Sequence, residues 1–243
     1  MRNHNLEYED NETRKYAYDF DSVIRRYLLR TLERHFVQGG TVLELGCFKG
    51  DMTEQILDYF PKITVVEAAS DLAEIVRNRF SGRVEVINAT FEDARIEPRF
   101  DNVFLVHTLE HLDDRIGILA RIRNWLSPCG KLFVAVPNAN ALSRQIAVKM
   151  GLIDYHSAVT PAEAKHGHRC TYSMDVLLSE MRQAGYRIED YGGVLLKPLA
   201  NFQFDRAIAE GIVSEAYIEA CHELAKTYPD LSASLYVVCA HPQ

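Results

Sequence analysis

The fold of this 243-residue chain is decided by the stretch Val42-Leu43-Glu44-Leu45-Gly46-Cys47-Phe48-Lys49-Gly50. An apolar strand runs into a tight turn with glycine at both ends, and a helical pattern follows. Glycine lets the backbone approach a ligand closely, and the first N–H groups of a helix can bind a carboxylate or a phosphate. The stretch therefore predicts a ligand site at the end of a buried strand. Taken alone it does not separate this chain from the dinucleotide-binding folds, which use a similar turn.

Short apolar runs alternate with helical patterns along most of the chain. Strands that alternate with helices at this spacing predict a parallel sheet covered on both faces. The last run is apolar on both faces over residues 235–239, so we expect this strand inside the sheet and not at its edge. The expected strands are residues 41–45, 63–67, 84–87, 100–107, 131–136, 186–196 and 234–240, and the expected helices are 52–59, 71–80, 115–126 and 173–184.

Three segments stand outside this alternation. Residues 1–38 are predicted to form an N-terminal helical appendage, and residues 39–243 the main domain. Insertions are expected at about 138–170 and 201–227, since both are too long for simple connections. The helical periodicity of the appendage rests on Val23, Ile24, Tyr27, Leu28 and Leu32.

Composition narrows the classes of function. Hydrophobic residues make up 47% of the chain and charged residues 25%, which is typical of a globular protein. The formal net charge of -7 disfavours a nucleic acid as the main partner. No long apolar run suggests a membrane span or a secretory signal, so a cytoplasmic location is expected. The five cysteines are scattered without a C-x-x-C pair, which argues against a disulfide framework or a structural zinc site.

Further motifs follow the later strands in order. The second strand ends in Glu67, where a carboxylate can bind both hydroxyls of a ribose. Residues 88–93, Asn-Ala-Thr-Phe-Glu-Asp, follow the third strand. The fourth ends in His107-Thr108-Leu109-Glu110-His111, and the turn Leu126-Ser127-Pro128-Cys129-Gly130-Lys131 precedes the fifth.

With these motifs in this order, the sequence resembles the class I S-adenosylmethionine-dependent methyltransferases, particularly their small-molecule branch. The resemblance runs through L-x-L-G-C-x-x-G, L-E-H and L-x-P-x-G-x-L elements from about residue 41 to 137, and more weakly beyond. It implies a three-layer, Rossmann-like α/β fold with a seven-stranded, mostly parallel sheet whose last strand is antiparallel. It also implies S-adenosyl-L-methionine as cofactor and O- or N-methylation of a small molecule such as a sugar, natural product or metabolite.

The resemblance assigns roles to individual residues. Glu44 and the glycine turn would border the methionine moiety, Glu67 would hold the ribose, and Thr90 would contact the adenine. Phe48 replaces a glycine of the usual turn, and Thr90 stands where many relatives have Asp. Glu67 could instead be surface charge, and Phe91 ordinary core. The implied cofactor-binding residues are Glu44, Gly46, Cys47, Phe48, Gly50, Glu67, Ala68, Thr90, Phe91 and His107.

Catalytic candidates are His111 and His107. Their spacing of four would suit a metal pair or a proton relay, although a histidine at a helix start is commonly a structural hydrogen bonder. Asp113 and Asp114 resemble helix caps, and no metal is predicted. The resemblance places the segment 166–172 at the acceptor pocket, with a solvated loop as the alternative.

Several alternatives remain open from the sequence. The chain could be a nicotinamide-dependent oxidoreductase on a similar sheet, although it lacks G-x-G-x-x-G, or a non-catalytic relative that binds S-adenosylmethionine. The acceptor and the oligomeric state are not readable. The N-terminal aromatic residues could form a lid over the cofactor or pack the appendage onto the sheet. They are Tyr8, Tyr16, Tyr18 and Phe20.

Overall fold

A single seven-stranded sheet forms the centre of the protein. The computed structural model describes residues 4–7, 17–97 and 99–242. The strand order is β3-β2-β1-β4-β5-β7-β6. All neighbouring strands pair in parallel except β7, which is antiparallel to both β5 and β6. The strands are β1 (Val42–Leu45), β2 (Ile63–Glu67), β3 (Val84–Asn88), β4 (Phe100–Val106), β5 (Leu126–Pro137), β6 (Arg187–Val194) and β7 (Ser234–Ala240).

The last strand occupies the interior position that its composition predicts. Val237 pairs with Val134 of β5 on one side and with Tyr191 of β6 on the other. All seven residues of β7 are buried. A strand that is covered on both faces and paired along both edges favours apolar residues at every position. The expectation of an interior, antiparallel last strand is confirmed.

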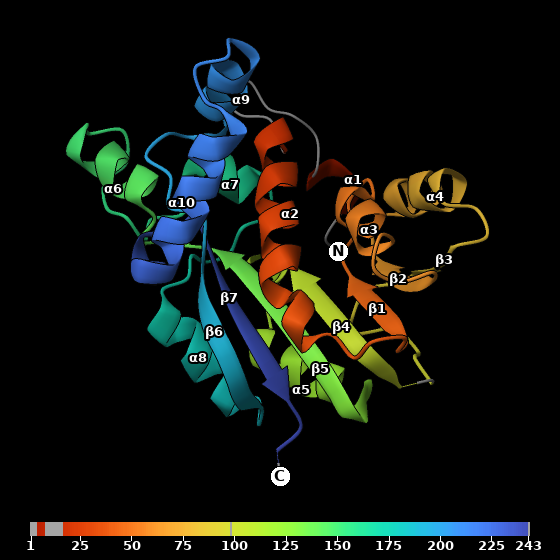
Figure 1. Ribbon diagram of the computed structural model, residues 1–243. Coiled ribbons are helices and arrows are strands. Elements are labelled where there is room, and N and C mark those ends of the chain that lie inside the picture. The colour runs from red at the N-terminus through yellow and green to blue at the C-terminus, as the bar shows by residue number, and fades with distance from the viewer. Residues whose placement is uncertain (1–3, 8–16, 98, 243) are drawn as a thin grey trace.

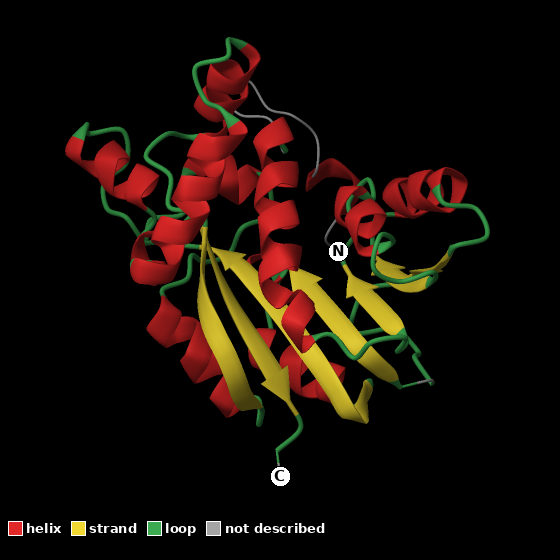
Figure 2. Cartoon of the chain, in the orientation of Figure 1, coloured by secondary structure: helices red, strands yellow, loops and turns green. Residues whose placement is uncertain are grey.

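Helices cover both faces of the sheet, which gives the predicted three-layer α/β architecture (Figure 1, Figure 2). Helices α2, α3, α9 and α10 contribute to the core on one face, and α5 and α8 to the core on the other. The helices around the sheet are α2 (Asp19–Leu32), α3 (Asp51–Ile56), α4 (Ser70–Arg79), α5 (Arg115–Arg123), α8 (Met174–Gln183), α9 (Asn201–Ala209) and α10 (Glu215–Thr227).

Aromatic rings fill the core between the sheet and α2. Phe104 of β4 and Phe133 of β5 stack with their centroids 4.8 Å apart, and Phe36 packs edge-on against both. On the opposite face, the aliphatic side chains of Leu105 and Ile118 are completely or almost completely buried. The alternation of side chains along the strands therefore supplies both cores.

The N-terminal segment packs closely against the rest of the chain. The ring of Phe20, at the start of α2, stacks on Phe204 of α9 with centroids 4.3 Å apart. For Phe20, the structure therefore supports a packing role and not a lid over the cofactor. Arg30 of α2 also pairs with Glu219 of α10 at 2.6 Å. Tyr8 and Tyr16 lie outside the described residues.

Each expected insertion contains two helices. Residues 138–170 hold α6 (Leu142–Lys149) and α7 (Pro161–Lys165), and residues 201–227 hold α9 and α10. A short helix, α1 (His4–Glu7), precedes α2. None of the described helices is long and apolar enough to cross a membrane.

The boundary expected between the helix at 115–126 and the strand at 131–136 is wrong by several residues. Helix α5 ends at Arg123, and β5 begins at Leu126 instead of Lys131. Phe100 donates its N–H to the carbonyl of Trp125, and Leu126 then pairs with Phe100 before a register shift. Pairing at the start of β4 therefore places in β5 both Leu126, which the sequence pattern assigns to the helix, and residues 127–130, which it assigns to a turn.

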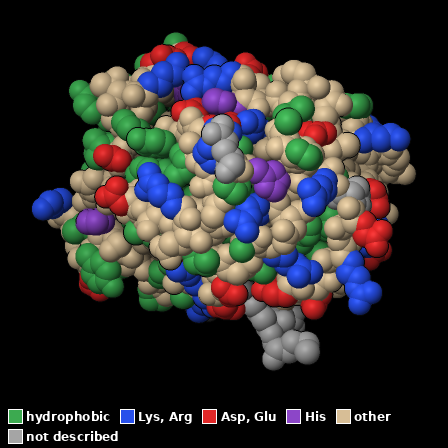
Figure 3. Space-filling view, turned by 90° about the horizontal axis from the view of Figure 1, so that it is seen from below, with side chains coloured by type: hydrophobic (Ala, Val, Ile, Leu, Met, Phe, Trp, Pro, Cys, Tyr) green, Lys and Arg blue, Asp and Glu red, His purple; other side chains and the backbone are tan. Residues whose placement is uncertain are grey.

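The amino-terminal end of the parallel strands carries mixed charge. Figure 3 shows this end from below, with Lys and Arg side chains interspersed among Asp and Glu. One mixed cluster joins Arg34 and His35 to Asp190 of β6, at 2.7 and 2.8 Å. The opposite end of the strands holds the cavity described next.

Candidate active site

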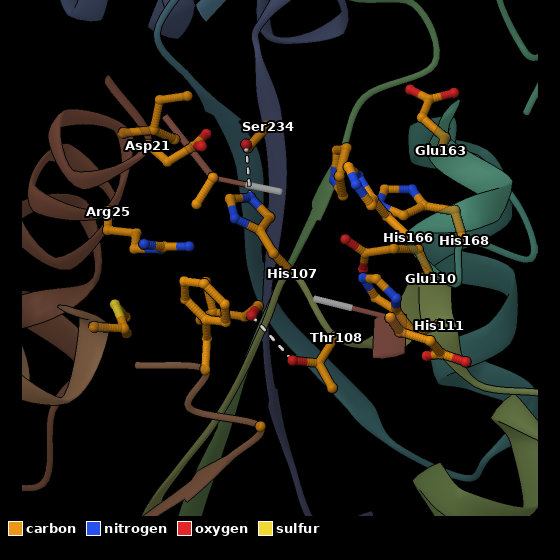
Figure 4. A pocket seen from close by; sticks show the side chains of 18 of the residues that line it. Asp21, Arg25, His107, Thr108, Glu110, His111, Glu163, His166, His168 and Ser234 are labelled. Carbon is orange, nitrogen blue, oxygen red and sulfur yellow. Dashed lines mark hydrogen bonds between the residues drawn. The ribbon is translucent and has the colours of Figure 1, made fainter. Parts of the chain in front are cut away.

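A cavity of about 740 Å³ lies at the carboxyl ends of β1, β2 and β4. In open α/β sheets this is the edge at which ligands bind. Residues of α2 line one side, and the opposite side is formed by the segments after β4 and around α7 (Figure 4). Of the predicted site residues, those that line the cavity are Gly46, Cys47, Phe48, Glu67, Ala68, Thr90, Phe91, His107 and His111, whereas Glu44 and Gly50 do not line it.

The turn after β1 needs glycine at both of its ends. Gly46 has φ +79°, and a Cβ atom there would lie 2.8 Å from Oγ1 of Thr108. Gly50 has φ +89°, and its Cβ would lie 2.5 Å from the ring of Phe80. Phe48 adopts φ +51°, a conformation that is uncommon for a side chain of its size. The backbone of this turn is therefore specified by close contacts and by strain.

Glu67 joins this turn to the end of β2. Its Oε2 accepts the backbone N–H groups of Cys47 at 3.1 Å and Phe48 at 3.2 Å, and its Oε1 accepts that of Ala69 at 2.9 Å. The side chain is buried and lines the cavity. These contacts exclude the alternative that Glu67 is merely surface charge.

Glu44 lies behind the turn, where it is almost completely buried. Thr53 donates its hydroxyl to Oε2 of Glu44 at 2.6 Å, and Oε1 has no hydrogen-bond partner among the described residues. Burial raises the pKa of Glu44 to about 7, although Thr53 and Arg25 act in the opposite direction. A carboxyl group in this position is costly to ionise, because water cannot solvate the carboxylate that forms.

Thr90 and Phe91 form the wall beyond β3. Thr90 donates its hydroxyl to Asp93 at 3.0 Å and accepts the Asp93 N–H at 3.3 Å, which stabilises the turn that follows. Phe91 is 8% exposed, packs in the core and also lines the cavity. Phe91 is therefore a core residue, as one sequence interpretation expects, and also part of the cavity wall, while its contact with adenine stays a prediction.

His107 lies near the centre of the cavity. Its Nε2 is 2.9 Å from the hydroxyl oxygen of Ser234, and its backbone N–H donates to Ala135 at 2.8 Å. Burial, together with smaller contributions from the neighbouring Arg25 and His168, lowers the pKa of His107 to about 3. The imidazole therefore stays neutral near pH 7.

The structure brings His111 together with a histidine from a distant part of the chain. The rings of His111 and His168 lie edge to face with centroids 4.6 Å apart, beside the buried carboxyl group of Glu110. His107 instead contacts Ser234, so the four-residue spacing of His107 and His111 does not produce a pair.

The two aspartates after this segment have different roles. Asp114 accepts the N–H of Gly117 at 2.9 Å and caps α5, as expected. Asp113 does not cap the helix and pairs with Arg169 at 2.9 Å. Asp113 therefore attaches the 166–172 segment to the end of β4.

Sequence reasoning missed the contribution of α2. Asp21 and Arg25 line the cavity, and Arg25 extends toward His107 (Figure 4). Its side chain is 15% exposed and lies 4.0 Å from Asp51. The available signal was the four-residue spacing of these two charges beside the apolar residues Phe20 and Ile24, because charge so close to a buried helix face needs a partner.

Comparison with known proteins identifies the family. The family model described as "Methyltransferase domain" matches residues 14–191. The chain belongs to this methyltransferase family. The match covers the glycine turn, Glu67 and the Glu110–His111 segment, and it favours a methyltransferase over the oxidoreductase and non-catalytic alternatives.

Individual relatives agree with this assignment. The chain is 29% identical over 168 residues to a "Ubiquinone biosynthesis O-methyltransferase" of Xanthomonas euvesicatoria pv. vesicatoria, covering 67% of this chain and 69% of that protein. An S-adenosylmethionine-dependent methyltransferase from Mesorhizobium loti superposes with a TM-score of 0.61 at 14% identity, over 86% of this chain and 95% of that one.

A third similar protein carries ligands. It is the 1,6-didemethyltoxoflavin-N1-methyltransferase of Burkholderia thailandensis, solved with 1,6-didemethyltoxoflavin and S-adenosylhomocysteine. Its TM-score is 0.59 at 17% identity, covering 92% of this chain and 80% of that one. The family match and the shared fold confirm the resemblance to class I S-adenosylmethionine-dependent methyltransferases.

Proposed function

We propose that this methyltransferase transfers a methyl group from S-adenosylmethionine to a hydroxyl group of a small molecule. The observation that carries the proposal is one continuous cavity with two chemically different ends. The glycine turn and Glu67 lie at one end, and Glu110, His111 and His168 at the other. The curated relative named for ubiquinone biosynthesis is an O-methyltransferase, which supports an oxygen acceptor.

The residues at the first end fit the cofactor. Gly46 lines the cavity without a side chain, while Thr108 fills the direction of its missing Cβ, so a ligand can approach the backbone of the turn from the cavity. Glu67 is buried at the end of β2, where its carboxylate can accept two ribose hydroxyls in place of its present backbone donors. Thr90 and the ring of Phe91 would border the adenine.

The methionine moiety has opposite charges to satisfy. We assign its carboxylate to Arg25, whose guanidinium group reaches into the cavity from α2. Glu44 lies behind the turn, close to the expected position of the amino group, whose positive charge would favour the ionised form of this carboxyl group. Cys47, Phe48 and the second glycine, Gly50, would shape the turn around this moiety.

A hydroxyl acceptor explains the polar groups at the second end. The cofactor supplies a methyl group on a positively charged sulfur, which is a good leaving group. A hydroxyl oxygen attacks well only when its proton is removed, whereas a neutral amine needs only alignment. His111 is the candidate base that receives this proton. The imidazole of His107, which is neutral near pH 7, would lie beside the reacting methyl group.

A labelling experiment tests the type of acceptor. The enzyme is incubated with S-adenosylmethionine carrying a ¹³C methyl group and with a small-molecule extract of the source cells, and products are analysed by NMR and mass spectrometry. We expect the label in a methyl ether, with one S-adenosylhomocysteine formed per product. Label on nitrogen or carbon would overturn the proposal.

A further inference from the structure

Three potential metal ligands meet at the acceptor end of the cavity. One donor atom from each of Glu110, His111 and His168 lies within 4.8 Å of the other two. Glu110 and His111 belong to the short helix η2 (Leu109–His111) after β4, and His168 follows α7, more than 50 residues later. Figure 4 shows the three side chains facing one another on the same side of the cavity.

Backbone and side-chain contacts hold the two segments in this arrangement. Arg169, next to His168, donates its backbone N–H to the carbonyl of Glu110 at 2.8 Å and its Nε to Asp113 at 2.9 Å. His168 donates its own N–H to the carbonyl of Glu163 at 3.1 Å. The donor groups are therefore positioned by the fold before any ligand binds, which favours binding.

The helix before His168 is itself fixed in place. Thr160 and Glu163 form a reciprocal capping box at the start of α7. Glu163 also pairs with Arg144 of α6 at 2.7 Å. These contacts connect both helices of the 138–170 insertion to the position of His168.

A second observation points independently to a positively charged ligand. Glu110 is 1% exposed, and its Oε2 has no hydrogen-bond partner among the described residues. Buried carboxylates are normally paired, hydrogen bonded or coordinated to a metal, because an unsatisfied one is costly. An unsatisfied carboxylate oxygen beside two imidazoles is the arrangement that a cation would complete.

We propose that Glu110, His111 and His168 bind a divalent transition-metal cation at the acceptor end of the cavity. This site goes beyond the sequence prediction, which expects no metal. Two imidazole nitrogens and one carboxylate oxygen are donors that suit Zn²⁺ and its first-row neighbours, whereas Mg²⁺ and Ca²⁺ prefer oxygen donors throughout. Three protein ligands leave a coordination position open for substrate, as in catalytic zinc sites.

The site would recognise and activate the acceptor, and this step rests on the proposed function. An acceptor oxygen coordinated by the cation loses its proton to solvent more easily, because the cation stabilises the oxyanion. This oxygen then forms the new bond to the methyl carbon as the carbon–sulfur bond breaks. The electron pair of that bond stays on sulfur, which leaves as the neutral thioether. The preferred acceptor is then a small molecule with two adjacent oxygen donors, which can chelate the cation.

Metal binding can be measured without cofactor or acceptor. Protein without an affinity tag is treated with a chelator, then titrated with Co²⁺ under visible absorption and with Zn²⁺ by calorimetry. We expect one cation per chain. The substitutions Glu110→Gln and His168→Ala should each weaken binding by more than about 10-fold, since even loss of an outer-shell partner costs this much. His156→Ala, at an exposed histidine of the same insertion, is the matched control and should leave the affinity unchanged.

Every outcome decides the proposal. Melting temperature and affinity for S-adenosylhomocysteine show that each variant is folded, and Glu110→Gln preserves side-chain shape if His168→Ala does not fold. Absence of stoichiometric binding to the wild type overturns the site. So does binding that persists unchanged in Glu110→Gln and His168→Ala, or that falls equally in His156→Ala. No methyl transfer is measured in this experiment. Failure of the hydroxyl-acceptor proposal would therefore not affect the result for metal binding, and failure of metal binding would not affect the hydroxyl-acceptor proposal.

Discussion

The carboxylate of Glu67, at the end of β2, accepts the backbone N–H of Cys47, in the turn after β1, at 3.1 Å. The same oxygen accepts the N–H of Phe48, so one side chain fixes the turn from the neighbouring strand. Glu67 therefore has a structural role before any ligand binds. If the ribose hydroxyls donate to this carboxylate, the hydrogen bonds from the N–H groups of the turn must rearrange. Cofactor binding is then coupled to the conformation of the turn.

Gly46→Ala should reduce both stability and cofactor affinity. Its Cβ would lie 2.8 Å from Oγ1 and 2.9 Å from Cγ2 of Thr108, at a φ of +79°. We expect a loss of about 2 to 4 kcal/mol in the free energy of unfolding, from left-handed strain and overpacking together. Chemical denaturation and calorimetry measure the two effects.

Gly39→Ala is the matched control for this substitution. Gly39 has φ +68°, but nothing lies within 4 Å of its Cβ position. This variant should show only the strain, about 1 to 2 kcal/mol, with normal cofactor affinity. Equal losses in the two variants would contradict the proposed close contact at Gly46.

Arg25→Ala should weaken S-adenosylmethionine binding by roughly 10- to 150-fold, the usual effect of losing a hydrogen bond to a charged group. It should not weaken binding of 5′-methylthioadenosine, which lacks the carboxylate. Arg26→Ala, which removes the neighbouring exposed arginine paired with Glu215, is the control. An equal effect of Arg25→Ala on both ligands would show that Arg25 does not bind the carboxylate.

Glu44→Gln should change the pH dependence of stability. The pKa of Glu44 is raised from 4.5 to about 7 in the folded protein, so between these values the folded state binds more protons than the unfolded chain. This group therefore makes the free energy of unfolding fall as pH rises from 4.5 to 7. The variant lacks this effect, and should gain up to about 3 kcal/mol relative to wild type between pH 4.5 and 8.

Denaturation of both proteins across this range measures the gain. Thr53, Arg25 and Glu67 face Glu44, and their effects on its carboxylate are included in its pKa. Glu85→Gln, on the exposed side of β3, should show a constant difference from wild type. A pH-independent difference for Glu44→Gln would mean that Glu44 is ionised throughout.

His111→Ala should lower turnover by roughly 10²-fold or more while cofactor affinity stays nearly unchanged, if the acceptor is a hydroxyl. The histidine acts on the acceptor, either as a base or through the proposed cation, and lies away from the glycine turn. A small, mainly positional loss indicates an amine acceptor. Loss of melting temperature without a selective kinetic defect indicates a structural role, so all three quantities are measured on this one variant.

The sheet was predictable from sequence because its signals are local. Apolar runs fall at the observed strands, and the uniformly apolar run at 235–239 predicted an interior strand. The start of β5 was missed because it depends on the pairing of Leu126 with Phe100, a contact that helical periodicity does not reveal.

The site was only partly predictable, for a related reason. The glycine turn and Glu67 carry their signal in one short stretch and one spacing. The meeting of His111 with His168 depends on how the 138–170 insertion folds back, and the entry of Arg25 depends on how α2 packs. Such long-range contacts leave no periodic pattern. The sequence interpretation paired His111 with the nearer His107, which the structure directs to Ser234.

Calorimetric titration of S-adenosylmethionine into wild-type protein and Glu67→Ala tests the central claim most directly. We predict one site per chain in the wild type and affinity weaker by about 1 to 3 kcal/mol in the variant, since charge-assisted hydrogen bonds to the ribose are lost. Because Glu67 also holds the turn, the melting temperature of the variant is measured in parallel. Unchanged affinity in a folded Glu67→Ala protein would contradict the claim that this cavity binds the cofactor through Glu67.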